Sequence, residues 1–483
     1  MPVERCELAD DLTVSRVITG MWQIADMERK NGPLDADETA AHMAAYVEAG
    51  LTAFDMADHY GSAEIIAGRY RTNHDQERRG QFLTKWVPEP GPCTRDEVRE
   101  AVERALDRLA TDRLDLLQFH AWRYSDPSWL DQLFWLEELR DEGLIGHLGL
   151  TNFDTEHLAL VLHSGIRVVS NQVCFSLLDR RALRGMTELC ASSGVKILAF
   201  GTLAGGLLGE RWLGAPEPSV EELETWSEMK YRRFVDAAGG WEAFQRLLAA
   251  VDGVARRLGV SMANVATRWV LDQPGVGAVI VGARLGRSEH IADNVRVFDV
   301  ALDDDARAAL EAAFEGLPPV PGDCGDEYRK PPFLTASGDL SHHVDRFPAP
   351  YPVRQQATGR RRADSGTVWE ALAGFSRAIR VGDRILVSGT TATHGDRLMG
   401  GSDPGAQTTF CLDKIQGAIE SLGGRLEDVV RTRIFVADAA EWEPVTLAHG
   451  RRFRDIRPAN TLVQAPLVGD GYRVEIEAEA VVG

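Results

Sequence analysis

The amino-acid sequence predicts an α/β protein in which a closed (β/α)8 barrel of parallel strands precedes a smaller α+β domain. Three observations carry this prediction. Short apolar runs alternate with amphipathic stretches from about residue 15 to residue 315, a proline-rich interval follows, and the C-terminal residues then have a different order of strand-like and helix-like segments. With 483 residues, of which 44% are hydrophobic, the chain has enough material for more than one core.

Eight apolar runs are the expected barrel strands, and each is followed by a helix-like stretch. This count matches a (β/α)8 barrel, which usually needs about 250 residues plus insertions. The longest insertion, at about 209–240, is rich in Glu and Trp and is expected to form a loop over the barrel mouth. The eight runs lie at 15–22, 51–57, 82–86, 114–120, 146–152, 168–176, 196–203 and 277–283.

Residues 316–365 interrupt this alternation. Eight prolines lie between Pro318 and Pro352 without a helical or strand period, which predicts a linker or a tail that caps the barrel. A compact α+β unit is then expected from 366 to 483, so that the barrel domain is 1–315. Its expected elements are a hairpin and strand at 380–392, helices at 406–424 and around 441–454, and strands at 429–438, 460–467 and 472–482.

The charge and the cysteines exclude several classes of function. A net charge of −20 argues against a nucleic acid or an anionic membrane as partner, because both require a basic face. The six cysteines show no CxxC pair or metal-like spacing, so we expect reduced thiols and no metal site. The N-terminus lacks an apolar leader segment, and no run of about 18 apolar residues is present. A cytoplasmic location is therefore expected.

Four polar residues follow three successive predicted strands. They are Asp55 and Tyr60, then Lys85, then His120, and the C-terminal ends of barrel strands are where such folds place catalytic groups. A tyrosine can protonate a carbonyl oxygen if a nearby cation lowers its pKa from about 10. Lys85 can supply the cation, Asp55 can hold that lysine charged, and His120 can orient the carbonyl. The four residues therefore predict an enzyme that reduces carbonyl groups.

The chain resembles the aldo-keto reductase superfamily, a family of TIM barrels, over about residues 10–315. The resemblance implies an NAD(P)-dependent oxidoreductase that reduces an aldehyde, ketone or sugar carbonyl, or catalyses the reverse oxidation, with Tyr60 as general acid and base. It rests on GMW at 20–22, DMADHYG at 55–61, TKW at 84–86, FH at 119–120, LTNF at 150–153, NQV at 171–173, AFGTLAGGLL at 199–208 and VGARLGRSEHIADN at 281–294.

The same resemblance implies a nicotinamide cofactor bound in extended form without a Rossmann unit, and no GxGxxG follows an N-terminal strand. Thr151, Asn152 and Gln172 would hydrogen-bond the carboxamide, and Phe200 would stack on the nicotinamide ring. The backbone of the 201–208 loop would approach the pyrophosphate, as glycines permit. The contacts expected there come from Gly201, Leu203 and Gly282.

The adenosine end of the cofactor is expected at the last predicted strand. Arg284 falls where many relatives bind the 2′-phosphate, which favours NADPH and makes NADH the less expected cofactor. Arg287 would assist, or is a solvated arginine. Asp293 and Asn294 fall at the adenine-contact positions.

Three tryptophans, Trp22, Trp86 and Trp122, are expected to line the substrate mouth, unless they only pack at the barrel rim. An aromatic wall accepts apolar carbonyls as well as sugar rings, so it does not identify the substrate. The charged residues between 323 and 330 could contact a polar substrate, but a solvated linker is the preferred interpretation of that stretch.

Residues 366–483 resemble the reactive-intermediate deaminase (RidA/YjgF-like) family, whose α+β fold is chorismate-mutase-like. Active members bind the substrate carboxylate with an arginine, but Asn460 stands at that position and supplies no charge. Only Glu475 remains as a group to position water. We therefore expect this domain to serve assembly, as a homotrimer, or small-molecule binding. The resemblance rests on residues 375–389, 407–438, 457–463 and 474–480.

Two alternative functions remain open. A bifunctional reductase and imine deaminase would use both domains. A non-catalytic, nicotinamide-binding regulatory scaffold would use neither for turnover, and the intact set of four polar residues argues against it.

Overall fold

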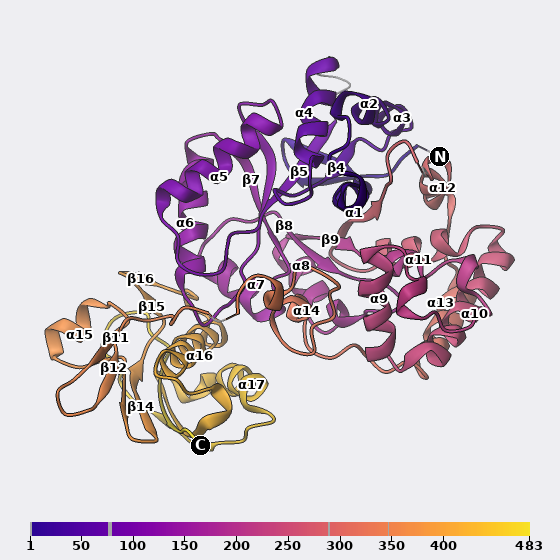
Figure 1. The fold of residues 1–483 in the computed structure, drawn as a ribbon. Coiled ribbons are helices and arrows are strands. Elements are labelled where there is room, and N and C mark those ends of the chain that lie inside the picture. The colour runs from indigo at the N-terminus through magenta and orange to yellow at the C-terminus, as the bar shows by residue number, and fades with distance from the viewer. Residues whose placement is uncertain (1, 76–79, 288–289, 346) are drawn as a thin grey trace.

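The computed structural model describes residues 2–75, 80–287, 290–345 and 347–483 (Figure 1). Eight parallel strands close into a barrel in the order β10-β3-β4-β5-β6-β7-β8-β9, which confirms the predicted fold class. The strands are β3 (Val17–Gly20), β4 (Ala53–Asp55), β5 (Gln81–Trp86), β6 (Leu114–Phe119), β7 (Ile145–Thr151), β8 (Ser170–Cys174), β9 (Lys196–Phe200) and β10 (Val276–Gly282).

Helices surround the barrel, and several of them, such as α5, α7, α9 and α11, begin with a side chain that caps the exposed backbone N–H groups. Thr94 and Glu97 form a capping box at α5, and Thr225 and Glu228 form one at α9. The helices are α1 (Trp22–Asn31), α2 (Ala36–Ala41), α3 (Met43–Glu48), α4 (Ala63–Asn73), α5 (Arg95–Arg108), α6 (Ser128–Asp141), α7 (Thr155–His163), α8 (Met186–Ser193), α9 (Trp226–Ala237), α10 (Gly240–Leu258), α11 (Met262–Leu271), α12 (Ile291–Arg296) and α13 (Asp304–Phe314).

The N-terminal end of the barrel is closed by an antiparallel hairpin of β1 (Arg5–Ala9) and β2 (Leu12–Ser15). Its side chains Leu8, Leu12 and Val14 form one buried cluster with inward-facing barrel residues such as Leu83 and Leu116. The interior is therefore a packed core at this end, and the polar residues gather at the opposite, C-terminal end of the strands.

The insertion at 209–240 is more ordered than the predicted loop, because it contains the helix α9. The proline-rich segment also differs from a solvated linker. Residues 326–329 form a short helix, α14 (Asp326–Arg329), in which Glu327 and Arg329 are buried. The charged residues of this stretch find partners on the barrel, which is why their charge pattern misled the sequence interpretation.

The C-terminal domain begins before the predicted boundary at residue 366. The strands β11 (Val353–Gln355) and β12 (Arg361–Ala363) already belong to its seven-stranded sheet, of order β11-β12-β13-β14-β19-β17-β18. Both are three residues long, β11 is the edge strand and β12 its neighbour, and three of their six residues are arginines, so they lack the alternating apolar pattern of a half-buried strand. The other strands are β13 (Ala378–Val381), β14 (Arg384–Thr390), β17 (Val429–Val436), β18 (Ala459–Gln464) and β19 (Val474–Val481), with a separate pair β15 (Thr393–His394) and β16 (Arg397–Leu398).

Two long helices, α16 (Pro404–Ser421) and α17 (Trp442–Phe453), accompany this sheet, and a short helix α15 (Val368–Ala373) precedes β13. Figure 1 shows α16 between the C-terminal sheet and the barrel, where it packs against α7. The helix α16 comes close to the barrel domain at Gly417, where a Cβ would lie only 2.2 Å from the carbonyl oxygen of Ser125.

A buried histidine connects the two domains at this interface. His157 of α7 contacts Asp154 through Nδ1 (2.7 Å) and Asp413 of α16 through Nε2 (2.9 Å). Arg452 of α17 donates to the other oxygen of Asp413 at 2.6 Å. The ring of Tyr124 stacks on His157, with centroids 3.4 Å apart. The two carboxylates raise the pKa of His157 to about 9 against the opposing effect of burial, so the imidazole is charged at neutral pH.

Among the described helices, none is long and apolar enough to cross a membrane. The described residues also contain no group of three or more metal-ligating side chains that could hold an ion.

Candidate active site

Three of the four predicted catalytic residues lie together at the C-terminal end of the barrel, where Asp55 and Lys85 are buried and Tyr60 is partly buried. Lys85, in β5, donates from Nζ to Asp55 Oδ2 (2.6 Å) and to the carbonyl oxygen of Met56 (2.8 Å). Its Nζ also lies 4.8 Å from the ring centroid of Tyr60, in the loop before α4. Both charged residues are only 3% exposed, so their ion pair is shielded from water.

The other oxygen of Asp55 is held by two amides. Gln118 Nε2 donates to Oδ1 at 3.1 Å and Gln172 Nε2 donates to it at 2.7 Å. Gln172 also donates to the side-chain oxygen of Gln118. The amide predicted to face a carboxamide thus supports Asp55 in this structure. The two glutamine amides therefore orient the Asp55 carboxylate, and this carboxylate in turn holds the Lys85 ammonium in place.

His120 lies at the end of the next strand and contacts the carbonyl oxygen of Thr151 through Nδ1, at 3.3 Å. Because a carbonyl oxygen only accepts, this contact puts the proton on Nδ1 and leaves Nε2 as an acceptor. Burial, followed by the charge of Arg329, lowers the pKa of His120 well below its ordinary value. Its Nε2 is buried without a partner among the described residues. The site therefore presents a neutral ring with one unsatisfied acceptor.

The expectation that the pKa of Tyr60 lies below its ordinary value is wrong for this structure. Burial first, then the negative charge of Asp55 and the neighbouring Tyr328, raise the pKa of Tyr60 well above its ordinary value of about 10. The lysine charge is directed at Asp55 and Met56, and burial lowers the pKa of Lys85 itself. Tyr60 thus holds its proton at neutral pH, which is the state of a general acid.

Asn152 is the residue that best fits a bound carboxamide. It has a left-handed backbone, with φ of 59°, and its Oδ1 is buried without a hydrogen-bond partner in the described part of the chain. Phe200, at the end of β9, is half-buried. The unsatisfied acceptor of Asn152 suits the amide of a nicotinamide group, and the partly open ring of Phe200 suits stacking on its ring.

The glycine-rich loop after β9 is tightly packed. Gly201 has φ of 72°, and a Cβ there would lie 2.1 Å from the hydroxyl oxygen of Tyr231, so only glycine fits. Leu203 is partly buried. Gly282 ends β10 and is exposed, with the side chain of Gln23 about 3.1 Å from where its Cβ would lie.

The residues expected at the adenosine end lie together beyond β10. Arg284 is partly exposed and approaches Asp26 at 3.7 Å, and Arg287 is exposed. Asp293 accepts from the hydroxyl of Ser261 at 2.9 Å. Asn294 lies beside Asp293 in α12.

The three tryptophans differ in their surroundings. Trp22 begins α1 and is partly buried, whereas Trp86 and Trp122 are 8% and 6% exposed. Trp122 donates from its indole nitrogen to the carbonyl oxygen of Pro88 at 2.7 Å and packs against the ring of His120, with centroids 4.4 Å apart. Packing at the rim therefore accounts for much of the surface of Trp122.

Residues 323–343, which we name the capping segment, lie over this end of the barrel. Arg329 donates to the carbonyl oxygens of Ala121 (2.7 Å), Asn152 (2.5 Å) and Gly325 (3.2 Å). These contacts connect the loops after two barrel strands. Gly325 approaches so closely, with φ of 81°, that a Cβ there would lie 1.9 Å from the Asn152 carbonyl oxygen.

A buried ion-pair group anchors the capping segment to the barrel wall. Arg181 lies 2.7 Å from a carboxylate oxygen of Asp179 and 2.7 Å from one of Glu327, and all three side chains are at most 1% exposed. Tyr328, between Glu327 and Arg329, places its ring 5.9 Å from that of His120.

Sequence reasoning missed Tyr328 and also Lys230 of α9, whose Nζ donates to the Tyr328 hydroxyl at 2.7 Å. Neither residue follows a barrel strand, so no periodic signal marks them. The only available clue was the mixed charge of the insertion and of residues 323–330.

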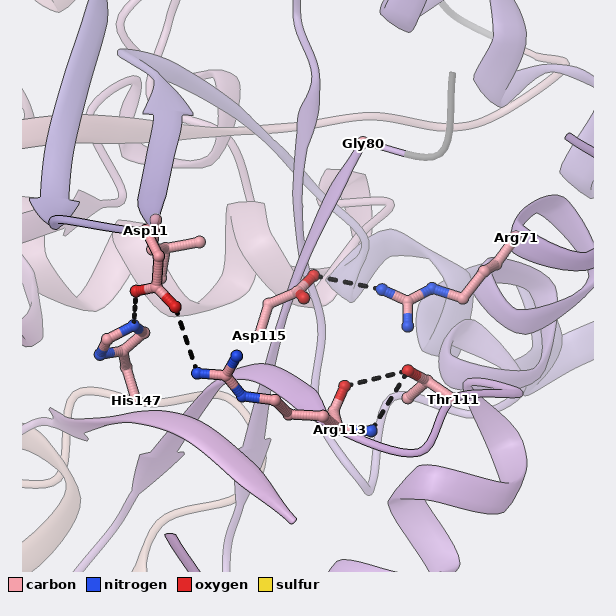
Figure 2. A pocket seen from close by; sticks show the side chains of 8 residues that line it. Asp11, Arg71, Gly80, Thr111, Arg113, Asp115 and His147 are labelled. Atoms are coloured by element: carbon pink, nitrogen blue, oxygen red, sulfur yellow. Dashed lines mark hydrogen bonds and ion pairs between the residues drawn. The ribbon is translucent and has the colours of Figure 1, made fainter. Parts of the chain in front are cut away.

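A separate pocket lies at the other end of the barrel (Figure 2). It has a volume of about 320 Å³ and is lined by residues at the start of strands. There Asp11 bridges His147 (2.5 Å) and Arg113 (3.2 Å), while Asp115 meets Arg71 at 3.3 Å. Its polar groups are paired with one another, at the end of the barrel away from the buried Lys85–Asp55 pair.

Two parts of the chain match known protein families. Residues 16–315 match the family model of the aldo/keto reductases, and residues 367–482 match the model described as endoribonuclease L-PSP. Protein tas of Escherichia coli is 30% identical over 274 residues, which cover 52% of this chain and 74% of that protein.

Two further similarities complete the comparison. An uncharacterised protein of Streptomyces coelicolor is 40% identical over 121 residues, covering 25% of this chain and 90% of that protein. The glycerol dehydrogenase of Gluconobacter oxydans superposes with a TM-score of 0.55 at 24% identity, covering 67% of this chain and 98% of that structure. The latter similarity shows the barrel fold.

Proposed function

The chain belongs to the aldo/keto reductase family, fused to an L-PSP (RidA/YjgF-like) domain, and from this premise of an oxidoreductase acting on carbonyl compounds we propose its specific reaction. It reduces an aldehyde, ketone or sugar carbonyl with NADPH, or catalyses the reverse oxidation, and Tyr60 exchanges the proton. The observation that carries this proposal is the buried Lys85–Asp55 pair beside a protonated Tyr60 and a neutral His120.

A bound nicotinamide dinucleotide would supply the hydride, and residues of the chain would supply the proton and orient the substrate. Tyr60 gives its proton to the carbonyl oxygen. Lys85, held in place by Asp55 and the Met56 carbonyl, provides a positive charge 4.8 Å from the tyrosine ring, which stabilises the phenolate as the proton leaves. Nε2 of His120 accepts a hydrogen bond from a substrate hydroxyl group next to the carbonyl.

A carbonyl screen tests the reaction. The purified full chain is incubated with NADPH and a panel of aldehydes, ketones and aldoses, and loss of the reduced cofactor is followed by absorbance. Reduction of at least one class is expected. Cofactor binding without turnover of any member of the panel would instead favour the regulatory scaffold.

The preference for NADPH predicts a selective effect of Arg284→Ala. Removing a charged hydrogen-bond partner of a phosphate costs roughly 1.5–3 kcal/mol, so the Kd for NADPH should rise by about 10- to 100-fold while that for NADH stays the same. Titration of cofactor fluorescence measures both constants. Arg287→Ala, which removes the neighbouring exposed arginine, is the matched variant. An equal rise of the Kd for NADPH and for NADH in Arg284→Ala would contradict a role at the 2′-phosphate.

For the C-terminal domain we propose assembly of the chain into a homotrimer. The sheet face away from α16 carries exposed apolar side chains at Leu386, Val430 and Val481. Such a face favours burial against another subunit. Light scattering after size exclusion should give three times the chain mass of 53.1 kDa. A monomer at micromolar concentration would contradict the proposal.

The contacts of the C-terminal domain do not favour the deaminase alternative. Asn460 donates to the hydroxyl of Thr432, which also contacts His449. Arg457 donates to the Arg454 carbonyl oxygen, and Arg473 is paired with Glu441. Arg457 and Arg473, the arginines that could replace the missing charge, are therefore engaged elsewhere.

A further inference from the structure

Lys230 is a buried cation at the barrel mouth for which the described residues provide no counterion. It is 5% exposed, and within the described chain its Nζ donates a 2.7 Å hydrogen bond to the Tyr328 hydroxyl. Aromatic rings surround it, since Nζ lies 4.7 Å from the centroid of Phe200, 4.8 Å from that of Tyr328 and 5.2 Å from that of Tyr231. Within the described chain, no carboxylate lies at ion-pair distance from Lys230. An ammonium group buried in this way is costly unless an anion joins it.

The charged residues around Lys230 also carry more positive than negative charge. Asp179 and Glu327, the carboxylates whose charges act on Lys230, are both paired with Arg181. Arg329 donates only to carbonyl oxygens, and its Nη2 is buried without a partner in the described chain. Apart from the paired Lys85 and Asp55, three buried cations, Lys230, Arg181 and Arg329, thus stand against two carboxylates, Asp179 and Glu327, in this group.

Lys230 lies at the reacting end of the proposed site. Its partner Tyr328 has its ring 5.9 Å from that of His120, and Tyr328 is close enough to raise the pKa of Tyr60. Phe200, the residue expected to stack on nicotinamide, is also in contact with Lys230. An anion bound by Lys230 would therefore lie beside the carbonyl group that Tyr60 and His120 address.

We propose that Lys230 and Tyr328 bind a carboxylate at or next to the carbonyl carbon of the substrate, so that the natural substrates are oxo acids. This proposal rests on the proposed reductase function. Lys230 has three N–H groups and uses one on Tyr328. The Tyr328 oxygen accepts this bond, so its own O–H remains available as a donor. The ammonium and this O–H are two adjacent donors, which match the two oxygens of one carboxylate.

A matched pair of substrates separates charge recognition from carbonyl recognition. Benzoylformate and its methyl ester share the aromatic 2-oxo group and differ in the carboxylate charge. In Lys230→Met, kcat/KM for benzoylformate should fall about 10- to 100-fold, whereas the value for the ester should change less than about threefold. Tyr328→Phe should give a smaller fall with the same selectivity. Lys330→Met, which removes an exposed lysine from the same segment, should leave both values unchanged.

Binding provides a readout that does not depend on turnover. With NADP⁺ present, benzoylformate should quench tryptophan fluorescence of the wild-type protein, and Lys230→Met should raise its Kd by the same factor. An equal fall of kcat/KM for acid and ester would mean that Lys230 only holds α9 to the capping segment, which overturns the proposal. A raised Kd for NADPH with an unchanged acid-to-ester ratio would assign the cation to a cofactor phosphate and would also overturn it.

The failure of the substrate proposal and of the proposed function can be told apart. If the wild-type protein reduces neutral aldehydes but neither reduces nor binds benzoylformate, the oxo-acid proposal fails and the reductase function stands. If benzoylformate binds through Lys230 but nothing in the carbonyl panel is reduced, the anion site stands and the reductase function fails.

Discussion

Replacing Tyr60 with phenylalanine should lower kcat for carbonyl reduction by at least about a hundredfold and leave the Kd for NADPH unchanged. A positioned general acid contributes about 10²–10⁴ to the rate, and phenylalanine keeps the ring but removes the proton. The contacts of the Tyr60 ring should survive the change. Lys85 Nζ lies 4.8 Å from the ring centroid, and the centroid of the His59 ring lies 4.8 Å from it. Single-turnover measurements with saturating cofactor isolate the chemical step from binding.

A second tyrosine provides the control for this experiment. Tyr351 is buried, and its hydroxyl has no hydrogen-bond partner in the described part of the chain, so Tyr351→Phe should leave turnover unchanged. Wild-type turnover in Tyr60→Phe would contradict the proposed mechanism. Because the pKa of Tyr60 lies well above its ordinary value, the wild-type rate of reduction should not decline as the pH rises through neutrality.

Replacing His157 with glutamine should weaken the docking of the two domains by roughly 3 kcal/mol. The histidine gains a pKa of about 9 in the folded chain from an ordinary value of 6.5, and each pKa unit corresponds to about 1.4 kcal/mol. The substitution leaves the buried Asp154 without its cation, while Asp413 keeps only Arg452. Breaking a buried ion pair is strongly destabilising, because one charge stays in a poorly solvated position.

The direction of the pH dependence follows from the raised pKa of His157. The stabilisation is complete below about pH 6.5, where the unfolded imidazole is also protonated, and is lost as the pH rises through about 9. Thermal unfolding between these values should therefore show a falling midpoint for the wild-type protein and a flatter profile for His157→Gln. His163→Gln, an exposed histidine of the same helix that lies 3.8 Å from Asp403, is the matched control. Identical profiles for wild type and His157→Gln would exclude a stabilising contact of the charged His157 with Asp154 and Asp413.

The barrel could be predicted because its strands carry their own signal. Parallel strands that helices cover on the outside appear in the sequence as short apolar runs. Polar residues near their C-terminal ends, such as Asp55 and Lys85, indicate the catalytic end of the barrel. The same reasoning failed for β11 and β12, since short edge strands bury too little to impose a pattern. It also failed for the pKa of Tyr60, which depends on burial by residues distant in sequence.

The capping segment shows the limit of local reasoning most clearly. Arg329 and Glu327 look like solvated charges until the barrel supplies carbonyl oxygens for one and Arg181 for the other. Lys230 and Tyr328 are separated by 98 residues and meet only because α9 and α14 pack over the same opening. No spacing rule connects them, so only the folded chain identifies them as a pair.

The hairpin of β1 and β2 closes one end of the barrel, so substrates must enter at the end covered by residues 323–343. That segment is a strap fixed at both ends, since the barrel precedes it and the C-terminal domain follows it along the chain. The same stretch of chain continues into the domain that His157 holds against α7. The cover of the barrel mouth and the docked C-terminal domain are thus two successive attachments of one stretch of chain to the barrel.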